Sequence, residues 1–147
     1  MLQELSRLNV DNVAVGETWR RLERDPKAQL VDVRTKAEWN FVGVPDLAPI
    51  GRSAILIEWQ TYPQGATASD FVERCSEALR QAGAAADTDI FFLCRSGARS
   101  LSAARALASA GFANCHNVAE GFEGPLDDKR HRVCGGWKAA GLPWFQG

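Results

Sequence analysis

The chain has 147 residues, 46% of them hydrophobic, and its 17 lysines and arginines nearly balance its 18 aspartates and glutamates, which leaves a net charge of −1. This size predicts a single domain over residues 1–147 with one buried core, and the balanced charge argues against nucleic-acid or membrane partners. Because the N-terminus lacks a signal-peptide core and no apolar run reaches the roughly 18 residues of a membrane span, we expect a cytoplasmic protein.

Apolar runs alternate with amphipathic segments along the chain, which is typical of α/β folds with a mostly parallel sheet. The first half should contain, in chain order, a weak strand at 12–15, a helix at 17–24, a strand at 29–33, a helix at 36–41, an irregular stretch at 45–52 and a strand at 53–57. Prolines and glycines mark the irregular stretch, and Pro26 ends the first helix.

The second half continues the alternation. It should contain a connector at 63–67, a helix at 68–82, a connector at 82–87, a strand at 90–93, a helix at 98–110, a strand at 114–118, a charged loop at 124–136 and a helix at 136–140. Gly111 ends the helix at 98–110. The mixed charges at 127–132 favour a solvated loop, although a lid or docking loop near a site is the alternative.

The most informative segment is 90–102, where an apolar run ends at Cys94, a short loop with Gly97 follows, and an Ala/Leu-rich helix begins. The first turn of a helix leaves backbone N–H groups without partners, and these groups bind anions. We therefore expect Cys94 to lie in a ring of donors, with Arg95 and Arg99 nearby. An inert core cysteine is the alternative, but a packed core has no use for two guanidinium groups beside a buried thiol.

The chemistry expected of such a thiol is covalent. Lowering the pKa of a free thiol by about two units from about 8.5 raises the thiolate fraction roughly 25-fold, while the nucleophilicity falls about 8-fold. The net kinetic gain is small. The amides, Arg95 and Arg99 should therefore serve mainly to hold charge on a bound anion or on a covalent sulfur adduct.

A metal site is not expected. The chain has four cysteines, Cys75, Cys94, Cys115 and Cys134, without a Cys-x-x-Cys pair, and His116 beside Cys115 is a poor zinc signal. Cys134 could resolve a Cys94 persulfide if the charged loop folds over the site, but an incidental cysteine is the simpler interpretation.

Several segments together resemble the rhodanese family over nearly the whole chain. These segments are Leu30-Val31-Asp32-Val33-Arg34 with Glu38-Trp39, the six-residue loop from Cys94 to Arg99, Asn117-Val118 with Gly121, and the closing run from Trp137 to Pro143. The chain departs from the family pattern at Val42-Gly43-Val44-Pro45-Asp46, where a Gly-His-Ile stretch is common, and by an apparent insertion between Gly121 and Trp137.

The resemblance implies a three-layer α/β/α domain with a five-stranded parallel sheet and a sulfurtransferase of the thiosulfate:cyanide type. Cys94 would accept a sulfane sulfur from a small anion such as thiosulfate and pass it from a persulfide to cyanide, a thiol or a protein acceptor. No metal or organic cofactor is required. The persulfide and the donor would be held by the loop residues Arg95, Ser96, Gly97, Ala98 and Arg99.

Asp32 and Arg34 follow a strand and could support catalysis, but pinning a loop is the favoured role. Arg34 and Glu38 also have the i,i+4 spacing of a helical ion pair.

Two other functions use the same thiol. A cysteine phosphatase or arsenate reductase would need an arginine six positions after the cysteine, where this chain has Ser100, and the shorter loop disfavours phosphate. A persulfide carrier or sensor without free turnover is the second alternative. A nucleotide-binding loop is excluded, because no Gly-Lys-Ser/Thr follows the strand.

Overall fold

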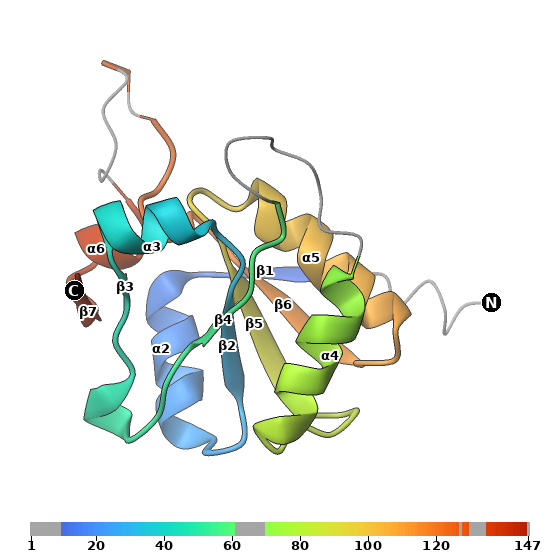
Figure 1. Cartoon of the computed structure of the whole chain (residues 1–147). Helices are drawn as coiled ribbons and strands as arrows, with labels where there is room; N and C mark the ends of the chain where they lie inside the picture. The colour runs from blue at the N-terminus through green and yellow to red at the C-terminus, as the bar shows by residue number, and fades with distance from the viewer. Residues whose placement is uncertain (1–9, 61–69, 127, 130–134, 147) are drawn as a thin grey trace.

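The computed structural model of the chain describes residues 10–60, 70–126, 128–129 and 135–146 (Figure 1). The elements in chain order are β1 (Asp11–Val13), α2 (Val15–Arg24), β2 (Gln29–Asp32), α3 (Lys36–Val42), β3 (Val44–Pro45), the 3₁₀ turn η1 (Ala48–Ile50), β4 (Ile55–Leu56), α4 (Phe71–Gln81), β5 (Asp89–Leu93), α5 (Ala98–Ser109), β6 (Asn114–Val118), α6 (Gly136–Ala139) and β7 (Trp144–Phe145).

Five of the strands form one parallel sheet in the order β1-β6-β5-β2-β4. The central strand β5 is apolar throughout its last four residues, and Ile90 to Leu93 are fully buried. Successive side chains of a strand point to opposite faces. Ile90 and Phe92 accordingly pack into one core cluster, and Phe91 and Leu93 pack into the other.

Helices cover both faces of this sheet, as an all-parallel sheet requires. On one face, Cys75 and Leu79 of α4 and Leu107 of α5 join the first core cluster. On the other face, Leu22 of α2 and Trp137 of α6 join the second. The three-layer α/β/α arrangement and the five-stranded parallel sheet predicted for the chain are therefore confirmed (Figure 1).

The carboxyl ends of the parallel strands lie at one edge of the sheet. The segments that contain Asp32, Cys94 and Asn117 therefore lie at this edge. Asp32 ends β2, Leu93 ends β5 and Val118 ends β6. Figure 1 shows the loop between β5 and α5 at this edge, between α3 and the start of α5. Ligands of open α/β sheets bind at the carboxyl ends of the strands, so the fold favours a site at this edge.

Some predicted boundaries were wrong. The strand expected at 53–57 is only two residues long, although the Ile57 N–H still donates to the carbonyl of Asp32, which ends β2, and the Trp59 N–H donates to the carbonyl of Val33, which follows it. The irregular stretch at 45–52 contains η1. The antiparallel pair of β3 and β7 was not predicted, because it joins segments about a hundred residues apart. The connector at 63–67, the start of the helix at 68–82 and part of the loop at 124–136 lie outside the described residues.

Candidate active site

The Cys94 thiol lies where β5 gives way to the loop before α5. Cys94 is only 1% exposed. Its Sγ accepts hydrogen bonds from the Gly97 N–H at 3.1 Å and from the Ser100 hydroxyl at 3.2 Å. Gly97 has φ +116°, a conformation that favours glycine and turns its N–H toward the sulfur. The thiol thus points at polar donors, although aliphatic side chains pack behind it.

The loop is held in this shape by the turn that follows β6. The Phe122 N–H donates to the Cys94 carbonyl at 2.8 Å, and the Glu123 N–H donates to the Arg95 carbonyl at 3.0 Å. In a trans peptide the C=O and the following N–H point in opposite directions. The N–H groups of Arg95 and Ser96 therefore face away from the turn that binds the carbonyls of Cys94 and Arg95, which leaves these N–H groups available to an anion.

Gly121 allows this close approach. A Cβ added there would lie 2.5 Å from the Cys94 carbonyl oxygen and 2.6 Å from the Arg95 carbonyl group, and the φ of Gly121 is +66°. The Gly121 that the resemblance singled out thus has a physical reason to be glycine, because any side chain would push the loop away.

The Ser100 hydroxyl connects the thiol to the neighbouring strands. Besides Sγ, its oxygen lies 2.5 Å from Asn117 Oδ1 and 3.2 Å from the Gly97 carbonyl. Asn117 Nδ2 in turn donates to the Gly97 carbonyl at 3.1 Å and to Asn12 Oδ1 at 2.9 Å. A hydroxyl carries one proton, so Ser100 can donate to the sulfur only by turning away from the other acceptors.

Ser100 and Asn117 were not predicted as site residues. In the sequence, Ser100 argued only against a phosphate-binding loop, and Asn117 contributed only to the resemblance to the rhodanese family. A positional signal was present in the sequence, since Ser100 lies in the first turn of the predicted helix and Asn117 near the carboxyl end of the predicted strand at 114–118. The full burial of Ser100 is seen only in the structure.

The two arginines of the loop have different surroundings. Arg95 is exposed, whereas Arg99 Nη1 and Nη2 donate to the two oxygens of Glu38 at 2.7 and 3.0 Å. Burial alone raises the pKa of the Glu38 carboxyl, but the hydrogen bond and charge of Arg99 outweigh it and lower this pKa below its usual range. Burial lowers the pKa of Arg99, but Glu38 above all, then Cys94 and Asp32, raise it.

The remaining predicted loop residues also line this edge. Ser96 and Gly97 are half-buried, and Ala98, the first residue of α5, is exposed. The structure thus brings Cys94 and the backbone of 95–99 together, but it commits Arg99 to a carboxylate partner.

Asp32 and Arg34 form a fully buried pair beside this loop. Arg34 Nη2 lies 2.6 Å from Asp32 Oδ2 and 2.7 Å from the Gly43 carbonyl, and its guanidinium lies 4.2 Å from the Phe122 ring centre. The contacts join the end of β2, the end of α3 and the turn after β6. The i,i+4 pairing of Arg34 with Glu38 is not formed, because Arg34 precedes α3 and bonds Asp32 instead.

The other described cysteines are unsuited to nucleophilic chemistry. Burial raises the pKa of Cys75 to about 12, with the charge of Cys115 adding to the effect, and burial raises the pKa of Cys115 to about 12. Cys134 lies outside the described residues. Within the described part of the chain, no group of His, Cys, Asp and Glu side chains could hold a metal ion.

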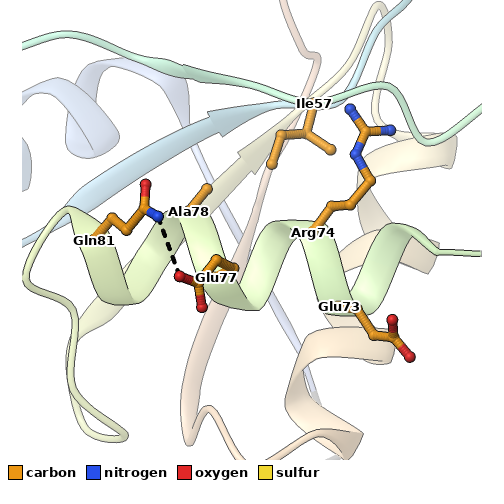
Figure 2. A pocket seen from close by; sticks show the side chains of 6 residues that line it. All are labelled: Ile57, Glu73, Arg74, Glu77, Ala78 and Gln81. Atoms are coloured by element: carbon orange, nitrogen blue, oxygen red, sulfur yellow. Dashed lines mark hydrogen bonds between the residues drawn. The ribbon is translucent and has the colours of Figure 1, made fainter.

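A separate hollow of about 430 Å³ lies against α4, lined by Ile57, Glu73, Arg74, Glu77, Ala78 and Gln81 (Figure 2). None of these side chains belongs to the loop at 94–99. Its lining is a charged helix surface over one isoleucine, so it adds nothing to the thiol site.

Comparison with known proteins agrees with this geometry. A family model described as the STR4 middle domain matches residues 11–147. The uncharacterized protein RP600 of Rickettsia prowazekii is 38% identical over 135 residues, which are 92% of this chain and 97% of that protein. The crystal structure of Rv0390 from M. tuberculosis superposes with a TM-score of 0.81 at 42% identity, covering 94% of this chain and 98% of that one.

The solution structure of a rhodanese-like domain from the Anabaena sp. protein Alr3790 has a TM-score of 0.61 at 21% identity and covers 95% of this chain and 81% of that one. The fold is therefore that of a rhodanese-like domain. Within this class, the chain belongs to the STR4 middle-domain family. In the described parts of the chain, no helix combines the length and apolar character needed to span a membrane.

Proposed function

We propose that the protein is a cytoplasmic sulfurtransferase that moves a sulfane sulfur through a persulfide on Cys94. The donor would be a small anion such as thiosulfate, and the acceptor a thiol or cyanide. The observation that supports this function best is the thiol itself, which accepts hydrogen bonds from the Gly97 N–H and the Ser100 hydroxyl at the start of a helix. The rhodanese-like fold of the relatives is consistent with sulfur transfer.

The proposed reaction has two displacement steps. The Cys94 thiolate attacks the outer sulfur of thiosulfate, an S–S bond forms to Sγ, and the donor S–S bond breaks so that sulfite leaves with the electron pair. The terminal sulfur of the persulfide keeps one negative charge. Cyanide then takes this sulfur as thiocyanate, or a thiolate takes it as a new persulfide, and the Cys94 thiolate returns.

The loop supplies the electrostatic part of this mechanism. The N–H groups of residues 95 to 99 would hold the charge on the terminal sulfur, as donors that are already in place before the charge arrives. The Ser100 hydroxyl can turn toward the sulfur anion, since Asn117 and the Gly97 carbonyl are alternative acceptors for its proton. Asp32 and Arg34 would serve as structural support for the loop.

Phosphoryl chemistry is less well supported by the same contacts. A phosphate-binding loop needs a guanidinium that is free to clamp two oxygens. Here both Nη atoms of Arg99 are bonded to Glu38. The position where the longer loop would carry its arginine holds Ser100, which is fully buried against the thiol.

The intact mass of the protein after incubation with thiosulfate tests the covalent step. The wild type should gain about 32 Da, the mass of one sulfur atom, and should then produce thiocyanate from cyanide. Cys94→Ser should show neither. The matched control is Cys115→Ser, which removes another buried thiol and should keep both.

Each outcome has a distinct meaning. A mass gain that persists in Cys94→Ser, or wild-type protein that never gains sulfur, would refute the proposal. A mass gain on Cys94 that neither cyanide nor a thiol removes would indicate a persulfide carrier instead, a function that the 1% exposure of Cys94 favours as the second candidate.

A further inference from the structure

Glu38 and Arg99 form an ion pair at the edge of the loop that carries the thiol. The two side chains come from α3 and from the first turn of α5, and they are 20% and 21% exposed. Their two hydrogen bonds, at 2.7 and 3.0 Å, join both Nη atoms to both carboxylate oxygens. Two parallel, charge-assisted hydrogen bonds of this kind form a strong and geometrically specific contact.

The Glu38 carboxylate is fixed by further donors from its own helix. The Thr35 N–H and hydroxyl donate to Glu38 Oε1 at 3.3 and 3.2 Å, while the Glu38 N–H donates to the Thr35 hydroxyl. This capping box begins α3 and holds the carboxylate in one place. The fold therefore holds the Glu38 carboxylate beside Arg99.

This pairing changes the charge that the loop presents to a sulfur donor. Arg99 is close enough to Cys94 for the charge of the thiolate to raise the pKa of the guanidinium, yet both of its Nη atoms are already committed to Glu38. Arg95 is exposed and makes no ion pair with a described residue. The charge of Arg99 is offset by Glu38, so Arg95 is the loop cation that lacks a counter-charge among the described residues.

We propose that Glu38 is a specificity-determining residue, which offsets the charge of Arg99 so that the site favours organic persulfides, R–S–S⁻, over the dianion thiosulfate. This proposal rests on the proposed function and names its donor class. In the loading step, Cys94 Sγ bonds to the terminal sulfur of the persulfide and the donor S–S bond breaks. The R–S group leaves with the electron pair and takes the proton of the Cys94 thiol.

The sign of the effect follows from the charges. A dianion responds twice as strongly as a monoanion to a change of one unit charge at the same distance, so a charge change alters the preference between the two donors. Glu38→Gln removes the counter-charge of Arg99 and should raise the loading rate with thiosulfate relative to that with the persulfide. Arg99→Gln removes the counter-charge of Glu38 and should have the opposite effect.

The test is a double-mutant cycle of Glu38→Gln and Arg99→Gln. The rate constant for sulfur loading onto Cys94 is measured in single turnovers by intact mass, with thiosulfate and with glutathione persulfide as donors. The readout is the ratio of the two rate constants. Glutamine at position 38 can still complete the capping box, so α3 should form in this variant.

We expect Glu38→Gln to raise the thiosulfate-to-persulfide ratio about tenfold and Arg99→Gln to lower it by a similar factor. The double variant should return close to the wild-type ratio, because both charges are gone. The control Glu17→Gln removes an acidic partner of Arg20 and Arg24 on α2 and should leave the ratio unchanged.

The opposite pattern would overturn the proposal. If Glu38 only positions Arg99 to grip an oxyanion, Glu38→Gln will lower the ratio as Arg99→Gln does, and the double variant will match Arg99→Gln. An unchanged ratio in Glu38→Gln also overturns it. Failure of the underlying function is separate, since neither donor would then load sulfur onto Cys94. Should Arg99→Gln fail to fold, the sign of the Glu38→Gln effect decides alone.

Discussion

The Ser100 hydroxyl lies within hydrogen-bond distance of the Cys94 sulfur, and its surroundings allow it to respond to charge. It lies 3.2 Å from Sγ and 2.5 Å from Asn117 Oδ1, so its single proton can be donated to either atom. A thiolate or persulfide anion attracts that proton more strongly than a neutral thiol does. The hydroxyl can therefore follow the charge while the backbone stays in place.

Replacement of Ser100 by alanine should slow sulfur transfer. A hydrogen bond to a charged group contributes about 1.5 to 3 kcal/mol, so kcat/KM for thiocyanate formation should fall roughly 10- to 100-fold. Steady-state assays at saturating cyanide would measure this. Ser102→Ala is the control, because the Ser102 hydroxyl is exposed and reaches only the Ala98 carbonyl, at 3.5 Å. Equal rates for the two variants would show that the hydroxyl carries no part of the charge.

The contrast among the cysteines shows what local sequence can predict about single residues. Cys94 was predicted to be the reactive thiol from the loop that follows it, and its function stays a prediction. Burial does not distinguish the three described cysteines, since all are at most 5% exposed, but no such loop follows Cys75 or Cys115. The contacts of Glu38 with Arg99 and of Ser100 with Asn117 could not be predicted in the same way. They join residues 61 and 17 positions apart, and no local pattern encodes which side chains meet at the sheet edge.

At the scale of elements, the strands and helices of the main sheet were predicted well because each has a local signal. The strand at 114–118 agrees in both bounds, and the central strand at 90–93 differs by one residue, since continuous apolar runs mark buried parallel strands. Edge elements were predicted poorly. β4 contains only two of the five residues expected in that strand. The strands β3 and β7 have two residues each, which is too short to show a hydrophobic periodicity.

The turn after β6 is the element on which the loop depends, and Gly121 tests it. Gly121→Ala should lower the free energy of unfolding by more than Gly51→Ala, because both residues have similar left-handed φ angles, +66° and +72°, but only Gly121 faces another backbone. The left-handed conformation alone should cost Gly51→Ala about 1 kcal/mol. The clash with the Cys94 carbonyl should add about 2 kcal/mol or more in Gly121→Ala.

Urea unfolding of both variants gives the comparison, and sulfur loading of Cys94 gives a second readout. Gly51→Ala should load sulfur at the wild-type rate, whereas Gly121→Ala should load slowly even where it is folded. Equal losses of stability in the two variants would mean that the turn yields at little cost and does not hold the loop.

At the scale of the whole molecule, two ion pairs connect the segments at one edge of the sheet. Asp32 and Arg34 are fully buried and join β2 to α3, while Glu38 and Arg99 join α3 to α5. A buried pair of this kind strongly destabilises a fold when one partner is removed, since it leaves an uncompensated charge. The partly exposed pair contributes less, but it makes stability depend on pH.

The sign of that dependence follows from Glu38. Its pKa in the folded protein is lowered, because the hydrogen bond and charge of Arg99 outweigh the effect of burial. A carboxyl whose pKa is lower in the folded than in the unfolded chain adds stability above its unfolded pKa, about 4.3 for glutamate, and this stability is lost as the pH falls through the folded pKa. The wild type should therefore lose more stability on acidification than Glu38→Gln.

Urea unfolding of the two proteins between pH 7 and pH 3 would measure this difference. The free energies of unfolding should differ by about 1 kcal/mol at pH 7, as for a well-formed but partly exposed pair, and should converge as the pH falls below the folded pKa of Glu38. The remaining carboxylates titrate in both proteins and cancel in the difference. Curves that stay parallel down to pH 3 would show that α3 and α5 are held together by packing alone, and the counter-charge assigned to Glu38 would then have no effect on the fold.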